Sequence, residues 1–301
     1  MRWTYDTRRD GDAAQFHGNP LITDDLVVTG SDGQGAGLVY AFDRKTGELR
    51  WKTPVDGQDT DLLRFGGLAI GGTTPGDLVA LDLLNGRVVW RFSPSERPWA
   101  RSHSRSPALA GDRVFFAGPD GKVRALEAAS GKVLWERDLG CNITTALLAT
   151  DAGVYAGGTD RRLYRLDPAT GTVTARIELE APPYGNLIAA GDVLLALVGE
   201  AGLVAVRSDL AGVRWQRKAA EEWSTPRPLV AGGTVLAGGP GELVALRLED
   251  GSPAWTLKLE GMPRGFGREG PILYLGTLRG TLSAYEIVPW LTPSPVRKGP
   301  S

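Results

Sequence analysis

One phrase repeats along this chain, and its spacing constrains the fold more than any other feature of the sequence. The segment 40–51 reads YAFDRKTGELRW, and segments 79–90 (VALDLLNGRVVW) and 124–135 (RALEAASGKVLW) repeat it. Weaker copies follow, so that the turn glycines of the six repeats lie 39, 45, 40, 41 and 39 residues apart. A period of this length that contains only strand patterns is typical of a β-propeller, in which each blade needs its neighbours to bury its faces.

Seven short segments alternate apolar and polar residues, as half-buried strands do. They are 39–43, 78–82, 123–127, 163–167, 203–207, 243–247 and 282–286. Two strands are expected before each of them, and a fourth strand of the tryptophan type is expected after six of them. The sequence therefore predicts an all-β, seven-bladed propeller of four-stranded antiparallel blades. We expect one domain over residues 1–288, followed by a proline-rich tail over 289–301.

The two ends of the chain are predicted to share the last blade. Only six tryptophan-type strands follow the repeated phrase, whereas residues 2–5 (RWTY) resemble residues 50–53 (RWKT). We therefore expect the N-terminal strand to complete the last blade, which would remove a free strand edge.

Composition excludes several classes of function. The chain of 301 residues carries 34 basic and 35 acidic residues, so no strong positive charge attracts nucleic acid or anionic lipid. Its single cysteine, Cys141, allows neither an intramolecular disulfide nor a thiolate zinc site, and we expect it to be a buried small side chain. No apolar run reaches membrane length, and direct membrane insertion is not expected. The compartment stays open: outside the cytoplasm if an export signal has been removed, and otherwise the cytoplasm.

The repeat resembles the tryptophan-docking repeat of the quinoprotein alcohol dehydrogenases and their propeller relatives. The shared pattern is Ala-x-Asp-x-x-x-Gly-x-x-x-Trp, and it extends over almost all of residues 1–288. The resemblance implies that each tryptophan packs against the alanine and turn glycine of a neighbouring repeat. Two departures predict weaker or shifted packing: Ala175 replaces one tryptophan, and Gly212 precedes Trp215 by three residues instead of four.

The resemblance does not carry the enzyme activity with it. The quinone dehydrogenases use a vicinal disulfide beside pyrroloquinoline quinone and a calcium ion, and a chain with one cysteine cannot form the disulfide. Non-catalytic relatives of similar size include BamB-like periplasmic lipoproteins and the sensor propellers of receptor kinases. We therefore expect no enzyme activity, no metal and no required cofactor, with pyrroloquinoline quinone kept as a possible ligand.

Candidate binding residues come from the loops that lead into the first strand of each blade, because rigid scaffolds usually present function on such loops. These loops are rich in arginine and aromatic residues, which dominate binding hot spots. The candidates are Arg64, Trp99, His103, Arg105, Tyr184, Trp223, Arg264 and Phe266. In a ring, Arg64, Arg105 and Arg264 would suit a small anion or peptide carboxylates, although the same arginines would also serve simply to shield a channel.

Three functions remain open at this stage. The leading hypothesis is a non-enzymatic, BamB-like scaffold, expected to be a monomer, that binds other proteins or peptides through its loops. The alternative is a ligand-sensing propeller for pyrroloquinoline quinone or another small anion, such as the sensor domain of a receptor kinase. A small dehydrogenase or hydrolase would require a catalytic cluster around His103 that the sequence does not supply.

Overall fold

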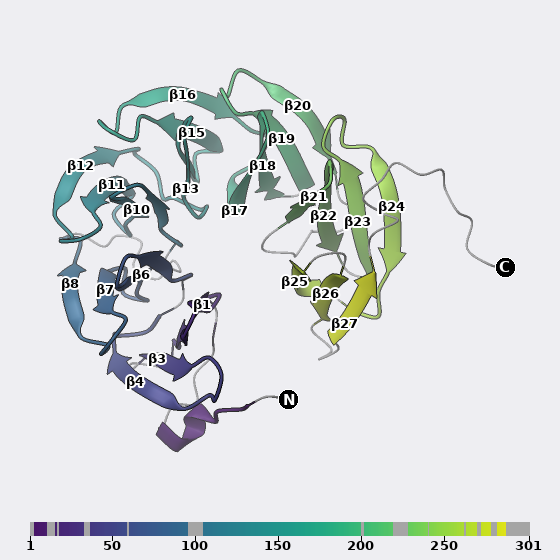
Figure 1. Cartoon of the computed structure of the whole chain (residues 1–301). Helices are drawn as coiled ribbons and strands as arrows, with labels where there is room; N and C mark the ends of the chain where they lie inside the picture. The colour runs from purple at the N-terminus through teal and green to yellow at the C-terminus, as the bar shows by residue number, and fades with distance from the viewer. Residues whose placement is uncertain are drawn as a thin grey trace. The chain divides into compact units, whose positions relative to one another are not determined.

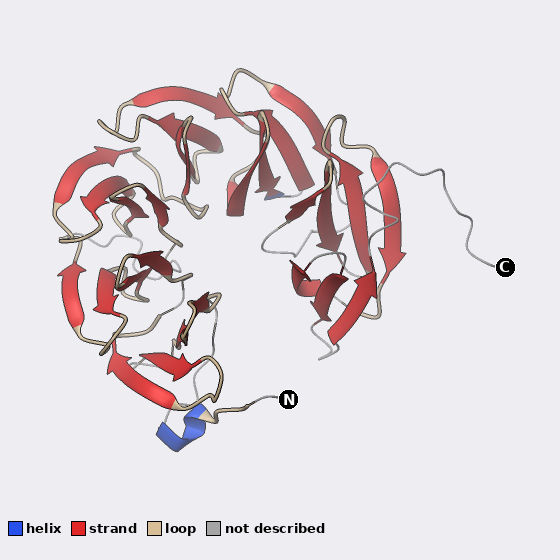
Figure 2. Ribbon diagram, in the orientation of Figure 1, coloured by secondary structure: helices blue, strands red, loops and turns tan. Residues whose placement is uncertain are grey.

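The computed structural model consists of consecutive antiparallel sheets. It describes residues 3–10, 16, 18–32, 37–58, 60–95, 105–199, 202–218, 228–239, 241–261, 263–269, 272–277 and 282–286. The short 3-10 helix η1 (Thr7–Asp10) precedes the first sheet, and strands make up the rest of the regular structure (Figure 2). Trp99, His103, Trp223 and the tail over 289–301 lie outside the described residues.

Seven sheets follow one another along the chain, coloured from purple to yellow in Figure 1. Sheet 1 contains β1 (Leu21–Ile22), β2 (Leu26–Gly30), β3 (Leu38–Asp43) and β4 (Leu49–Pro54). Sheet 2 contains β5 (Leu63–Phe65), β6 (Leu68–Gly72), β7 (Leu78–Asp82) and β8 (Val88–Phe92). Sheet 3 contains β9 (Ala108–Ala110), β10 (Arg113–Ala117), β11 (Lys122–Glu127) and β12 (Val133–Asp138). Sheet 4 contains β13 (Leu148–Thr150), β14 (Gly153–Gly157), β15 (Arg162–Leu166) and β16 (Val173–Glu178).

The later sheets repeat the same order. Sheet 5 contains β17 (Pro183–Ala190), β18 (Val193–Val198), β19 (Gly202–Arg207) and β20 (Val213–Arg217). Sheet 6 contains β21 (Leu229–Ala231), β22 (Thr234–Gly239), β23 (Glu242–Arg247) and β24 (Pro253–Lys258). Sheet 7 shows three strands among the described residues, β25 (Pro263–Glu269), β26 (Ile272–Thr277) and β27 (Leu282–Glu286).

These seven sheets confirm the predicted seven-bladed β-propeller of antiparallel blades. Each repeated phrase forms the third strand of its sheet, and in sheets 1 to 6 a tight turn and the fourth strand follow it, as predicted. The chain divides into two compact units, one formed by residues 1–160 and 164–174 and the other by residues 161–163 and 175–301. The single domain predicted over residues 1–288 stays a prediction.

Tryptophan docking between neighbouring repeats is confirmed. The indole Nε1–H of Trp51 donates to the Leu83 carbonyl at 2.9 Å, and that of Trp90 donates to the Ala128 carbonyl at 3.1 Å. A Cβ added to Gly86 would lie 2.6 Å from the Trp51 ring, so only glycine leaves room for the indole. Gly86 also has a φ of 76°, which disfavours other residues. The tryptophan and the glycine turn thus form one joint between two repeats.

The docking geometry repeats at three further joints. The same pair of contacts, an indole over a turn glycine and a hydrogen bond to a turn carbonyl, joins Trp3 to Gly47, Trp135 to Gly171 and Trp215 to Gly251. Trp215 thus docks like the others although Gly212 precedes it by only three residues. The turn at Gly212, in contrast, receives no docked side chain, and it follows the repeat in which Ala175 replaces the tryptophan. Nothing lies within 4 Å of a Cβ added to Gly212, and Leu210 takes the left-handed conformation of that turn with φ 59°.

Every fully described tryptophan strand also carries a bulge. Ala41 pairs with Trp51 and Phe42 pairs with Leu49, so Arg50 is left between them, and the equivalent shift recurs in sheets 2, 3, 5 and 6. A bulge re-aims the strand and leaves one residue without a partner in the ladder. The cores of the sheets are formed by the second and third strands, whose fully buried residues include Ile70, Leu81 and Phe115.

Candidate functional site

The loops before the first strands of sheets 1 to 4 belong to the first unit, and hydrogen bonds connect them to one another. We call residues 18–20, 60–62, 105–107 and 143–147 the loop face. The backbone N–H and the side-chain amide of Asn19 donate to the Asp61 carboxylate at 2.8 and 2.9 Å. The Asp61 N–H donates to the Ser106 hydroxyl at 3.1 Å, and the Leu147 N–H donates to the Ser106 carbonyl at 3.3 Å.

The repeat itself supplies this relay. Leu21, Leu63 and Ala108 occupy the same register in β1, β5 and β9. Asn19, Asp61 and Ser106 are each two residues before that position. Successive blades therefore present a polar residue at one equivalent point, within reach of the next. Four loops that are far apart in sequence are fixed together before any partner binds, and such pre-organisation lowers the entropic cost of binding.

A buried polar layer supports the loop face. Gln58, Thr60, Thr73 and Ser31 are all nearly inaccessible to solvent. The Gln58 amide donates to the Thr60 carbonyl at 3.1 Å, and the Thr60 hydroxyl accepts from the Gly72 N–H at 2.8 Å. These hydrogen bonds hold the loop backbone, but the layer is only partly satisfied, because the buried Gln58 Oε1 has no hydrogen-bond partner among the described residues.

Arg105 belongs to the loop face, as predicted, and it has a structural contact there. Its Nε–H donates to the Ile143 carbonyl at 3.1 Å, and the side chain is half-buried. Arg105 therefore joins the loop before β9 to the loop before β13. The sequence places Arg105 in a loop, but it does not predict the hydrogen bond to the Ile143 carbonyl.

Arg64 lies at the other end of the sheets from the loop face. Arg64 is exposed on β5. Its Nε–H donates at 3.2 Å to the carbonyl of Gly66, in the turn that follows this strand. The loop face precedes β5, so Arg64 and Arg105 are at opposite ends of first strands. The two arginines do not share one surface within the first unit, and Arg264 belongs to the second unit.

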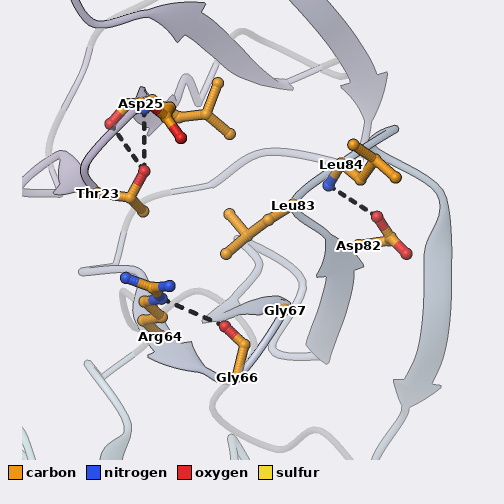
Figure 3. Close-up of a pocket in the computed structure, with 9 residues that line it drawn as sticks. Thr23, Asp25, Arg64, Gly66, Gly67, Asp82, Leu83 and Leu84 are labelled. Carbon is orange, nitrogen blue, oxygen red and sulfur yellow. Dashed lines mark hydrogen bonds between the residues drawn. The ribbon is translucent and has the colours of Figure 1, made fainter.

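Arg64 lines a shallow pocket of about 320 Å³ between the turns of sheets 1 and 2 (Figure 3). We call it the turn pocket. It is lined by Thr23, Asp25, Leu26, Arg64, Gly66, Gly67, Asp82, Leu83 and Leu84. Figure 3 shows the Leu83 side chain pointing from the turn that carries Asp82 toward Arg64 and toward the turn that carries Thr23 and Asp25. The Asp82 carboxylate accepts the Leu84 N–H at 2.7 Å and so caps its own turn. No sequence pattern predicts this pocket, because it depends on which turns of two repeats lie side by side.

The other predicted residues are on strands. Tyr184 is part of β17, pairs with Leu197 and packs against the core of sheets 5 and 6, so it is half-buried. Arg264 and Phe266 are on β25, where Phe266 pairs with Leu275. The predicted binding role of these residues stays a prediction.

Two observations on the described residues concern metal binding and catalysis. Among them, no group of three or more His, Cys, Asp or Glu side chains is placed to hold a metal ion. The Cys141 thiol is buried, as expected, and burial together with the nearby Asp160 raises its pKa to about 12. A thiol with such a pKa is protonated and a poor nucleophile at neutral pH. With a single cysteine, the chain also cannot form the vicinal disulfide that the quinone dehydrogenases place beside their cofactor.

No helix among the described residues has both the length and the apolar character needed to cross a bilayer.

Comparison with known proteins extends the fold result. A family model described as outer membrane protein assembly factor BamB matches residues 2–152 and again residues 76–285. The crystal structure of BamB from Moraxella catarrhalis superposes with a TM-score of 0.75, at 20% identity, over 90% of this chain and 85% of that one. At this identity the superposition shows the fold, and it agrees with a propeller.

Curated relatives include assembly factors and, more distantly, enzymes. The outer membrane protein assembly factor BamB of Burkholderia pseudomallei is 27% identical over 179 residues, which are 54% of this chain and 44% of that protein. The quinoprotein alcohol dehydrogenase PedH of Pseudomonas putida is 28% identical over 137 residues, 39% of this chain and 22% of the enzyme. The chain thus spans less than half the length of these curated relatives.

Proposed function

Because the chain belongs to the family described as outer membrane protein assembly factor BamB, we propose that it is a non-enzymatic scaffold that binds other proteins through its loop face. The observation that carries this proposal is the relay from Asn19 through Asp61 and Ser106 to Leu147. A fixed surface assembled from four separate loops suits recognition of a folded or extended protein segment. No reactive side chain is needed for that role.

The chemistry of the site favours this proposal over an enzyme. Protein recognition needs pre-organised polar groups and exposed surface. The relay pre-organises the loop face, and Asn19 and Pro20 are exposed on it. We further propose that the chain acts as a monomer outside the cytoplasm, at the cell envelope where its assembly-factor relatives are named to act. A quinone cofactor is not part of the proposal.

Site-specific photocrosslinking tests the proposal directly. Pro20 is exposed on the loop face, and a benzoylphenylalanine placed there should form adducts with specific proteins in envelope extracts. The matched control is the same probe at Leu134, which is 44% exposed on β12 and far from the loop face in its sheet. Adducts from position 20 that are absent at position 134 support the proposal. Adducts at position 134 alone, or none at either position, contradict it.

Calorimetric titration with pyrroloquinoline quinone, with and without calcium, addresses the alternative role. We expect no saturable heat. Tight one-to-one binding would instead support ligand sensing.

A further inference from the structure

Arg64 stands out when the sheets are compared at one register position. The residue that occupies its position is Ile22, Leu109, Ala149, Ala189 or Val230 in the other complete sheets, and Arg268 in sheet 7. Among the six complete sheets, only sheet 2 carries a charge there. The fold therefore does not require an arginine at this point, and the side chain is exposed at the rim of the turn pocket.

Leu84 is a second departure of the same sheet. It is 87% exposed at the tip of the turn between β7 and β8, where other repeats have Lys45, Ala129, Ala169 or Glu249. The turn does not need the leucine, because the Asp82 carboxylate caps it and Gly86 provides its left-handed residue. Exposed leucines are common singly, but this one lines the same pocket as Arg64.

The remaining lining residues of the turn pocket indicate which kind of ligand it can bind. Leu83 and Leu26 give the turn pocket an apolar wall beside Leu84. No hydrogen bond or ion pair joins the terminal guanidinium nitrogens of Arg64 to the described residues, so they are available to a carboxylate in a bidentate arrangement. Asp25 is exposed on the other side of the pocket, and Asp82 is nearby. Two carboxylates repel a polyanion, whereas a single negative charge next to Arg64 is tolerated.

We propose that the turn pocket binds an extended peptide segment of a partner protein, one that carries a single carboxylate beside an apolar side chain. The carboxylate pairs with Arg64, and the apolar side chain packs on Leu83 and Leu84. This inference rests on the proposed scaffold function and adds a second contact surface, at the opposite end of the sheets from the loop face. A partner that reaches both surfaces would gain affinity from two linked contacts.

Fluorescence anisotropy with two blocked, labelled pentapeptides tests the pocket. One peptide has the sequence Ser-Leu-Glu-Leu-Ser, and the other replaces its glutamate with glutamine. The intact chain is expected to bind the glutamate peptide about tenfold more tightly, as one charge-assisted hydrogen-bond pair allows. Arg64→Gln should remove this preference, and Leu84→Asn should weaken both peptides.

Arg87→Gln is the matched control. Arg87 is an exposed arginine next to the turn that carries Leu84, and it does not line the pocket. This variant should keep the tenfold preference. Equal binding of the two peptides, a preference that persists in Arg64→Gln, or no binding at all would overturn the proposal. Competition by inorganic phosphate as effective as that by the peptide would also overturn it, since it would indicate a small-anion site. The crosslinks from position 20 do not depend on this pocket, so the two proposals fail separately.

Discussion

At the scale of single residues, the tryptophan joints determine how neighbouring repeats fit. Trp51 is 8% exposed and touches both the Leu83 carbonyl and Gly86, so a large apolar surface is buried with its only polar atom satisfied. Aromatic side chains bury much area at low entropic cost, and glycine provides the space. The joint therefore depends on two residues that are 35 positions apart.

Gly86→Ala should destabilise the protein more than Gly111→Ala. Both glycines have a left-handed φ, 76° and 60°, so both variants pay the conformational cost of about 1 kcal/mol. Only Gly86 adds a clash with the Trp51 ring, whereas nothing lies within 4 Å of a Cβ at Gly111. Urea denaturation should show roughly 1 to 3 kcal/mol of extra loss at Gly86. Equal losses would mean that the indole does not need the space.

Cys141 should resist alkylation in the folded protein. Its pKa of about 12 lies above that of an unfolded thiol, so the folded state disfavours the thiolate. Iodoacetamide at pH 8 should modify the thiol only after denaturant is added. By linkage, stability falls as the pH rises from about 9 towards 12, because the unfolded thiol ionises first. Cys141→Ala should reduce that slope, and rapid alkylation of the native protein would contradict the buried assignment.

At the scale of elements, loops and strand ends rather than whole strands distinguish one repeat from another. The third strands were predicted from the sequence almost residue by residue, since their alternation and spacing are local signals. The relay of Asn19, Asp61 and Ser106 and the turn pocket were not predicted, because both depend on which side chains of different repeats lie close together. Arg64 shows what the sequence does not predict. It was expected in the loop before β5, but it lies on β5 and contacts the turn at the far end of that strand. Trp99, His103 and Trp223 stay predictions.

Asp61→Ala should loosen the loop face without unfolding the sheets. The variant removes the acceptor of the two Asn19 amides, a loss of about 0.5 to 1.5 kcal/mol, because Asn19 is exposed and water replaces the carboxylate. Hydrogen exchange at the Asn19 amide should become faster, while exchange in β6 stays unchanged. Asp24→Ala, at an exposed turn carboxylate, is the control. Unchanged exchange at Asn19 would show that the relay does not hold the loop.

At the scale of the whole molecule, the predicted closure of the last blade explains an otherwise isolated contact. Trp3 packs on Gly47 and donates to the Arg44 carbonyl at 3.1 Å, as the fourth-strand tryptophans do on the repeats that follow them. Sheet 7 shows three strands among the described residues. A docking tryptophan before the first sheet agrees with the predicted closure, which stays a proposal.

Deleting residues 1–6 should lower the melting temperature of the entire protein in one transition. The deletion removes the Trp3 joint and, with closure, the fourth strand of the last blade, so both ends of the repeat array lose support. Differential scanning calorimetry measures the effect, and Arg8→Gln, which removes only an exposed ion pair with Asp6, is the control. A truncated protein that melts at the parent temperature would contradict the closure.

The most direct measurement for the scaffold function is the outer membrane protein content of the bacterium that carries this gene, before and after the gene is deleted. We expect the content to fall on deletion and to return when the intact chain is expressed. Expression of the Asp61→Ala variant at equal abundance should restore less, because its loop face is no longer fixed. Unchanged outer membrane protein content after deletion would contradict the proposed scaffold function.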